Sequence, residues 1–73
     1  MAIEELILGR AVGLTQNHRL RGYDAIQLAA ALVVHDQYLA AGLPGLTLIS
    51  ADNDMNTAAQ VEGLAADNPH SHP

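Results

Sequence analysis

Apolar positions in the first half of the chain follow two helical patterns. Residues 3–16 place apolar side chains at the spacing of one helix face, whereas residues 23–41 are apolar on nearly every side. A helix of the second kind is expected to be covered on both sides by other parts of the fold. Gly42 and the Pro44-Gly45 turn end it.

The second half of the chain predicts strands. Residues 46–50 form a short apolar run typical of a buried strand, residues 55–62 a helix, and residues 64–66 a second strand. The order α-α-β-α-β predicts an α/β fold with a short parallel strand pair joined by a right-handed crossover. Because two strands are too few for a stable parallel sheet, residues 1–69 are expected to be part of an α/β domain, with residues 70–73 as a polar tail.

Composition restricts how such a chain is stabilised. Hydrophobic residues make up 49% of it, but it has no Phe, Trp or Cys, so the core lacks large side chains and disulfides. Small domains of this kind usually need a metal or oligomerisation for stability. The composition therefore favours a homo-oligomer.

Charge restricts the partners. Three Arg and eight acidic residues give a net charge of −5, which opposes binding to a phosphate backbone and suits cations or a basic partner. No signal-peptide pattern and no apolar run of about 18 residues is present, so we expect a cytoplasmic protein without a membrane association.

Two acidic motifs stand where a site would form. Asp24 opens the sequence DAIQLAAA, and Asp52 ends the sequence SAD directly after the first predicted strand, with Asp54 two residues further on. The sequence AQVEGL at residues 59–64 and an NP pair at residues 68–69 follow. In this order the motifs resemble the C-terminal half of a PIN domain, as found in VapC-type toxins.

The resemblance implies a parallel sheet between helices and a ribonuclease activity that depends on Mg²⁺ or Mn²⁺. It gives Asp24 and Asp52 a catalytic role, Asp24, Asp52 and Asp54 a role as metal ligands, and the chain an antitoxin-type protein partner. The position of Asp52 suits this role, because ligands of an α/β sheet bind beyond the carboxyl ends of its strands. Mg²⁺ prefers carboxylates, water and phosphate oxygens.

The chain also departs from the family pattern. The family's first Asp, its middle Glu and its first strand have no counterpart, because Glu4 and Glu5 lie too close to the Asp24 motif to supply that Glu. We therefore expect a truncated PIN-like α/β/α domain that binds RNA productively only if the missing acids are supplied. The alternative is a non-catalytic interaction or oligomerisation module derived from a PIN domain.

Each candidate residue also has a purely structural explanation. Asp24 could cap the long helix, and Asp52 or Asp54 the helix that follows. Arg19 and Arg21 would contact phosphates in a nuclease, but exposed Arg in a loop is more often solvated surface. The sequence alone leaves these alternatives open.

Two further motifs lack residues that their chemistry requires. Residues 52–56 copy the start of an EF-hand loop, but Thr57 stands where that loop needs Gly and Gly63 where it needs Glu. His18 and His35 have no Cys, Ser or partner motif, so nucleophilic catalysis has no support. Two histidines in the tail could bind a stray transition metal.

Overall fold

The computed structural model describes residues 2–69, so the tail at residues 70–73 lies outside the described residues. The elements are α1 (Ile3–Asn17), α2 (Gly22–Ala40), β1 (Thr47–Ile49), α3 (Asn53–Val61) and β2 (Ala65–Asp67). The predicted order and type of the elements are confirmed, and the helix and strand bounds differ from the sequence prediction by one or two residues at most ends.

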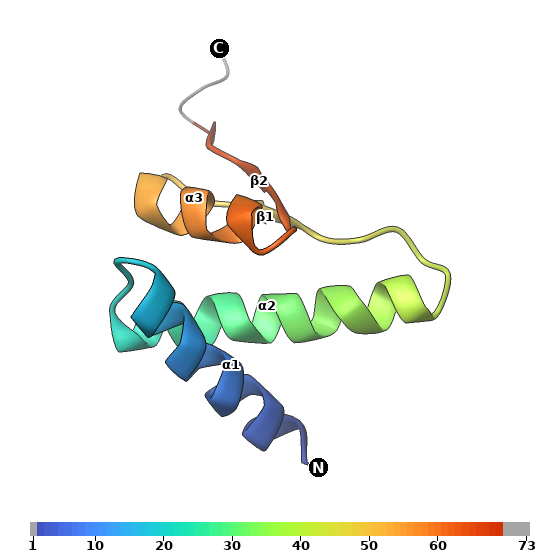
Figure 1. Ribbon diagram of the computed structural model, residues 1–73. Helices are drawn as coiled ribbons and strands as arrows, with labels where there is room; N and C mark the ends of the chain where they lie inside the picture. The colour runs from blue at the N-terminus through green and yellow to red at the C-terminus, as the bar shows by residue number, and fades with distance from the viewer. Residues whose placement is uncertain (1, 70–73) are drawn as a thin grey trace.

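Helix α2 lies in the middle of the molecule. Figure 1 shows α1 crossing one side of α2, while α3 and the two strands lie along its other side. The chain is therefore a mixed helix and strand protein with two parallel strands. The expectation that α2 is covered on both sides holds for its buried side chains, but Tyr23 and Leu39 at its two ends remain 72% and 54% exposed.

The strands form a parallel pair with one covered face. Thr47 pairs with Ala65, Leu48 with Ala66, and Ile49 with Asp67. Because side chains alternate along a strand, the middle pair points toward the core, where both residues pack against buried side chains. The flanking pairs are exposed, and the Ile49 side chain is 71% exposed on the face that no element covers within residues 2–69.

The core is built from Leu, Ala and Met. Its four largest fully buried side chains come from α1, α2 and the residue before β2: Leu14, Leu28, Leu32 and Leu64. Small residues of α2 and α3 are buried between them, so the helices approach closely. Within residues 2–69, no charged or polar residue is fully buried.

Glycines end α2 and α3. Gly42 and Gly63 have φ angles of 77° and 93°, which residues other than glycine rarely adopt. The next residue in each case, Leu43 or Leu64, donates its backbone N–H back to the carbonyl five residues earlier, at 2.9 Å. These are Schellman motifs, and the helix stop expected at Gly42 is confirmed.

The segment between α2 and β1 is held by a histidine. The backbone N–H of Leu46 donates to Nδ1 of His35 at 2.9 Å, so the ring carries its proton on Nε2. Gly45 lies against the same ring, and a Cβ atom there would come within 2.7 Å of Nδ1. Any larger residue at this position would therefore push the ring aside.

Candidate functional site

The turn after β1 is organised around Asp52. Oδ1 of Asp52 accepts hydrogen bonds from the backbone N–H groups of Asp54, at 2.9 Å, and of Met55, at 3.2 Å. Asp52 is therefore the N-cap of α3, as one of the sequence alternatives predicted. Both capping bonds go to Oδ1, and Asp52 is an exposed residue.

Neighbouring side chains brace the same turn. Oγ of Ser50 accepts from the backbone N–H of Asp52 at 3.0 Å, and Nδ2 of Asn56 donates to the Ser50 carbonyl at 2.8 Å. These bonds hold the backbone of the turn, while the two capping bonds hold the Asp52 carboxylate itself. A site on this turn would have one preorganised carboxylate.

Asp24 does not cap α2. The helix begins at Gly22 after the N-cap residue Arg21, which makes no side-chain capping bond, and Asp24 falls within the first turn. The alternative that Asp24 caps this helix is wrong, because Gly22 and Tyr23 already belong to it. A carboxylate in the first turn is still favoured by the positive end of the helix dipole.

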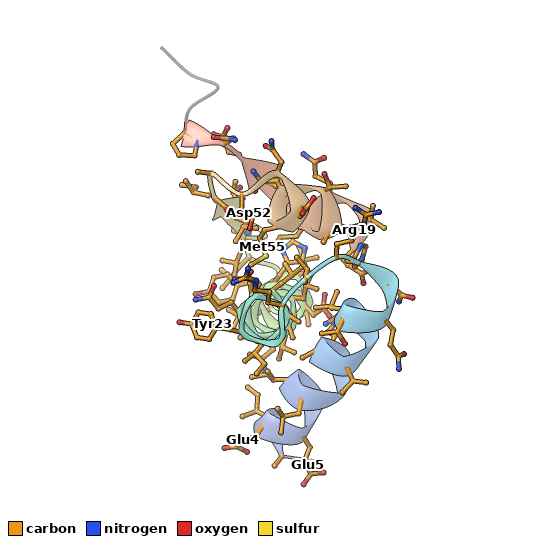
Figure 2. All side chains as sticks on the ribbon, turned by 90° about the vertical axis from the view of Figure 1, so that its left-hand side faces the viewer. Glu4, Glu5, Arg19, Tyr23, Asp52 and Met55 are labelled. Atoms are coloured by element: carbon orange, nitrogen blue, oxygen red, sulfur yellow. The ribbon has the colours of Figure 1, made fainter. Side chains whose placement is uncertain are left out.

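Asp24 and Asp52 come from the same end of the fold. The N-termini of α2 and α3 both lie at the left in Figure 1, beyond the carboxyl end of β1. Figure 2 views this end directly, with Asp52 on the α3 side and Tyr23 beside the start of α2. Within residues 2–69, however, no three acidic or histidine side chains converge on one point, so Asp54 does not complete a group of three ligands with them.

Asp67 is a further carboxylate that the sequence reasoning left out. It ends β2, pairs with Ile49, and its carbonyl accepts from the backbone N–H of Ser50 at 3.0 Å. Because the strands are parallel, Asp67 lies at the same edge of the pair as the Asp52 turn. The signal was present, since an acidic residue directly after the second predicted strand occupies the position that Asp52 occupies after the first.

The three arginines divide into two kinds. Nη1 of Arg10 donates to Oδ2 of Asp36 at 2.8 Å and joins α1 to α2. Arg19 and Arg21 are exposed in the turn between α1 and α2 and make no ion pair within the described part of the chain. They remain available to an anionic partner near the N-terminus of α2.

The histidines have structural partners. Nε2 of His18 lies 3.1 Å from Oε2 of Glu62, and the two side chains are 12% and 28% exposed. This pair ties the end of α1 to the end of α3. With His35 bonded to Leu46, neither histidine faces a nucleophile, and the two tail histidines lie outside the described residues.

Comparison of the chain with family models, curated proteins and solved structures finds no match. Among residues 2–69, no helix combines the length and hydropathy needed to cross a bilayer.

Proposed function

We propose that this chain is a PIN-like half-site, which contributes Asp24 and the Asp52 turn to a Mg²⁺ or Mn²⁺ centre of the ribonuclease type. The observation that carries the proposal is the common location of the α2 and α3 N-termini beyond the carboxyl end of β1 (Figure 1). Parallel strands direct ligands to this edge of a sheet. The fixed carboxylate of Asp52 supports the proposal, as does the positive end of each helix dipole.

The chemistry of such a centre is phosphodiester hydrolysis. When bound, Mg²⁺ would supply an activated water and stabilisation of charge on the leaving oxygen. On this chain, Asp24 and Asp52 would hold the ion, Asp54 would attract it electrostatically, and Arg19 or Arg21 would contact the RNA phosphates.

By itself the chain should bind the metal weakly and leave RNA uncut. Two carboxylates leave the ion largely hydrated, and a misplacement of about 1 Å can cost on the order of 10²-fold in rate. The remaining ligands would come from a second polypeptide. RNA binding is opposed by the net charge of −5.

Paramagnetic Mn²⁺ tests the site. Added to the isotope-labelled chain, Mn²⁺ should first broaden the amide NMR signals of the first turns of α2 and α3. Asp24→Asn and Asp52→Asn should each reduce the broadening at both turns, and the second variant keeps the cap because Asn is an equally good N-cap. Glu4→Gln removes an equal charge from the far end of α1 and is the matched control.

The outcomes are distinct. Broadening that is uniform over the acidic surface, or equal in both Asp variants and in Glu4→Gln, refutes the half-site. Cleavage of single-stranded RNA by the isolated chain, abolished in the Asp24→Asn/Asp52→Asn double variant, would instead make it a complete nuclease.

The second candidate is a non-catalytic interaction module. Its specific support is the amount of apolar surface left on α1, where Ile3, Leu6, Leu8 and Val12 are between 44% and 57% exposed. Patches of this kind mark interaction surfaces. Specific oligomerisation together with absent Mn²⁺ broadening would favour this function over the half-site.

A further inference from the structure

The connection between α2 and β1 is anchored to the helix at one point. Figure 1 shows the chain turning back after α2 and running toward β1. Past the helix stop at Gly42, Pro44 has no N–H to donate. Within residues 2–69, the bond from the backbone N–H of Leu46 to Nδ1 of His35 is the one hydrogen bond that joins residues 44–46 to α2. This bond therefore ties the residue directly before β1 to the helix.

The acceptor of this bond exists only on the neutral ring. A neutral imidazole has one nitrogen with a hydrogen and one without, and the N–H of Leu46 donates to the second. In the charged ring both nitrogens carry hydrogens, so neither can accept. Turning the ring over does not restore the bond, because either nitrogen then presents an N–H to the N–H of Leu46. Protonation of His35 therefore replaces an attraction by a repulsion.

The ring is also packed closely against the connection. A Cβ atom at Gly45 would come within 2.7 Å of Nδ1, and His35 is itself partly buried. A charged imidazole in this place faces an N–H group at short range, whereas it gains hydration by moving into water. The ring and the connection should therefore separate when the ring becomes charged.

No acidic partner holds the charged ring in place. Its ionisable neighbours along α2 are Asp36 and Tyr38, and Asp36 already accepts from Nη1 of Arg10 on α1 at 2.8 Å. Residues 41–51 contain no ionisable side chain. The remaining acidic side chains of α1, of α3 with its C-cap and of β2, none of which forms an ion pair with His35 within residues 2–69, are Glu4, Glu5, Asp54, Glu62 and Asp67.

We propose that the hydrogen bond between Leu46 and His35 is a pH-sensitive latch, which holds the connection to α2 while the ring is neutral and releases it when the ring is charged. The latched state has no proton on Nδ1 and the released state has one, so falling pH favours release. Release takes place between about pH 8 and pH 5, where histidine side chains change their charge. The helices stay packed, because none of the fully buried core residues comes from the connection.

Release of the latch changes how β1 is attached to the rest of the fold. Helix α2 packs on α1 and α3 rather than on β1. When the latch opens, β1 is held through α3 and β2, and no longer through the connection that precedes it. Acid therefore loosens β1, and the Asp52 turn that follows it, from α2. This inference does not depend on the proposed function.

Amide exchange measured by NMR on the full chain tests the latch. The protection factor of the Leu46 amide compares its exchange rate with that of an unstructured peptide at the same pH. It should fall at least about fivefold between about pH 7.5 and about pH 5. The amide of Leu32, which is buried in the middle of α2, should keep its protection factor within about twofold over this range. Nδ1 of His35 should be unprotonated at neutral pH, and its nitrogen chemical shift should titrate with the same midpoint as the protection of Leu46.

Two variants assign the pH dependence to one ring. His35→Asn keeps an acceptor oxygen near the position of Nδ1 but takes up no proton, so Leu46 should be protected equally at both pH values. All carboxylates and the two tail histidines remain in this variant. His18→Asn removes the other histidine of residues 2–69 and is the matched control, which should keep the pH dependence of the parent. Circular dichroism checks that each variant is folded.

Three results overturn the proposal. The first is a protection factor of Leu46 in the parent that does not change with pH. The second is a change of the same size in His35→Asn. The third is a proton on Nδ1 of His35 at neutral pH, a result that the parent chain gives without any substitution.

Discussion

Because Gly45 lies against the His35 ring, Gly45→Ala should destabilise the fold when the ring is present and stabilise it when the ring is removed. In Gly45→Ala the new Cβ would lie 2.7 Å from Nδ1 of His35, so the ring must move away. Moving the ring breaks the hydrogen bond from Leu46, a net loss of about 1 kcal/mol. Overpacking strain adds a further ~1 kcal/mol or more. We therefore expect Gly45→Ala to lower the free energy of unfolding by about 2 kcal/mol.

Removing the ring should reverse the effect. The φ angle of Gly45 is not positive, so alanine fits the backbone once His35→Ala has cleared the space. In that background Gly45→Ala should stabilise the fold by about 0.5 kcal/mol, because alanine restricts the unfolded chain. Urea unfolding followed by circular dichroism measures all four proteins, since the chain has no Trp to serve as a fluorescent probe.

Gly9→Ala is the matched control for this cycle. A Cβ at Gly9 meets no atom within 4 Å, and the residue lies inside α1. Alanine there should stabilise the chain by about 0.5–1 kcal/mol whether or not His35 is present. If Gly45→Ala costs the same in both His35 backgrounds, the clash with the ring is not the cause and the reasoning is refuted.

Three other sets of substitutions test the capping turn, the His18–Glu62 contact between helices, and the core. Asp52→Ala should lower the free energy of unfolding by about 1 kcal/mol, while Asp52→Asn should leave it nearly unchanged; equal losses in a urea titration would contradict the capping role. A double-mutant cycle on His18 and Glu62 should give a coupling of about 1 kcal/mol, and a coupling of zero would show that the pair adds no stability. Leu28→Ala, at a fully buried position, should cost about 3 kcal/mol in thermal or urea unfolding; a loss below ~1 kcal/mol would mean that the site collapses around the smaller side chain.

The elements of this fold could be predicted because each has a local signal. Apolar spacing marks α1 and α2, and glycines with positive φ end α2 and α3. The βαβ order then determines that the two strands are parallel, because a crossover helix returns the chain to the same edge. These features depend on residues close together in the sequence.

The contacts between elements could not be predicted in the same way. Arg10 and Asp36 are 26 residues apart, and His18 and Glu62 are 44 apart, with no pattern that links their positions. These residues meet only because α1 and α3 both pack against α2. The geometry of these two contacts follows from how the helices pack, and the spacing of residues along one sequence does not reveal that packing.

The candidate site was predicted in part. The turn at Asp52 follows from a capping residue placed directly after a strand, and the hydrogen bonds confirm its capping role. The alternative role of Asp24 as a cap failed because α2 begins at Gly22, two residues before Asp24. Whether these carboxylates bind a metal stays a prediction of the family resemblance.

The uncovered face of the parallel pair has a consequence for local stability. Each strand has three residues, and only Leu48 and Ala66 point toward the core, so separating β2 from β1 exposes little apolar surface. Local opening of this kind has a small free energy and precedes global unfolding. Amide hydrogens of the strand pair should therefore exchange with solvent deuterium well before those in the middle of α2. The three helices would then stay packed around their common core while β2 detaches from β1 and reattaches.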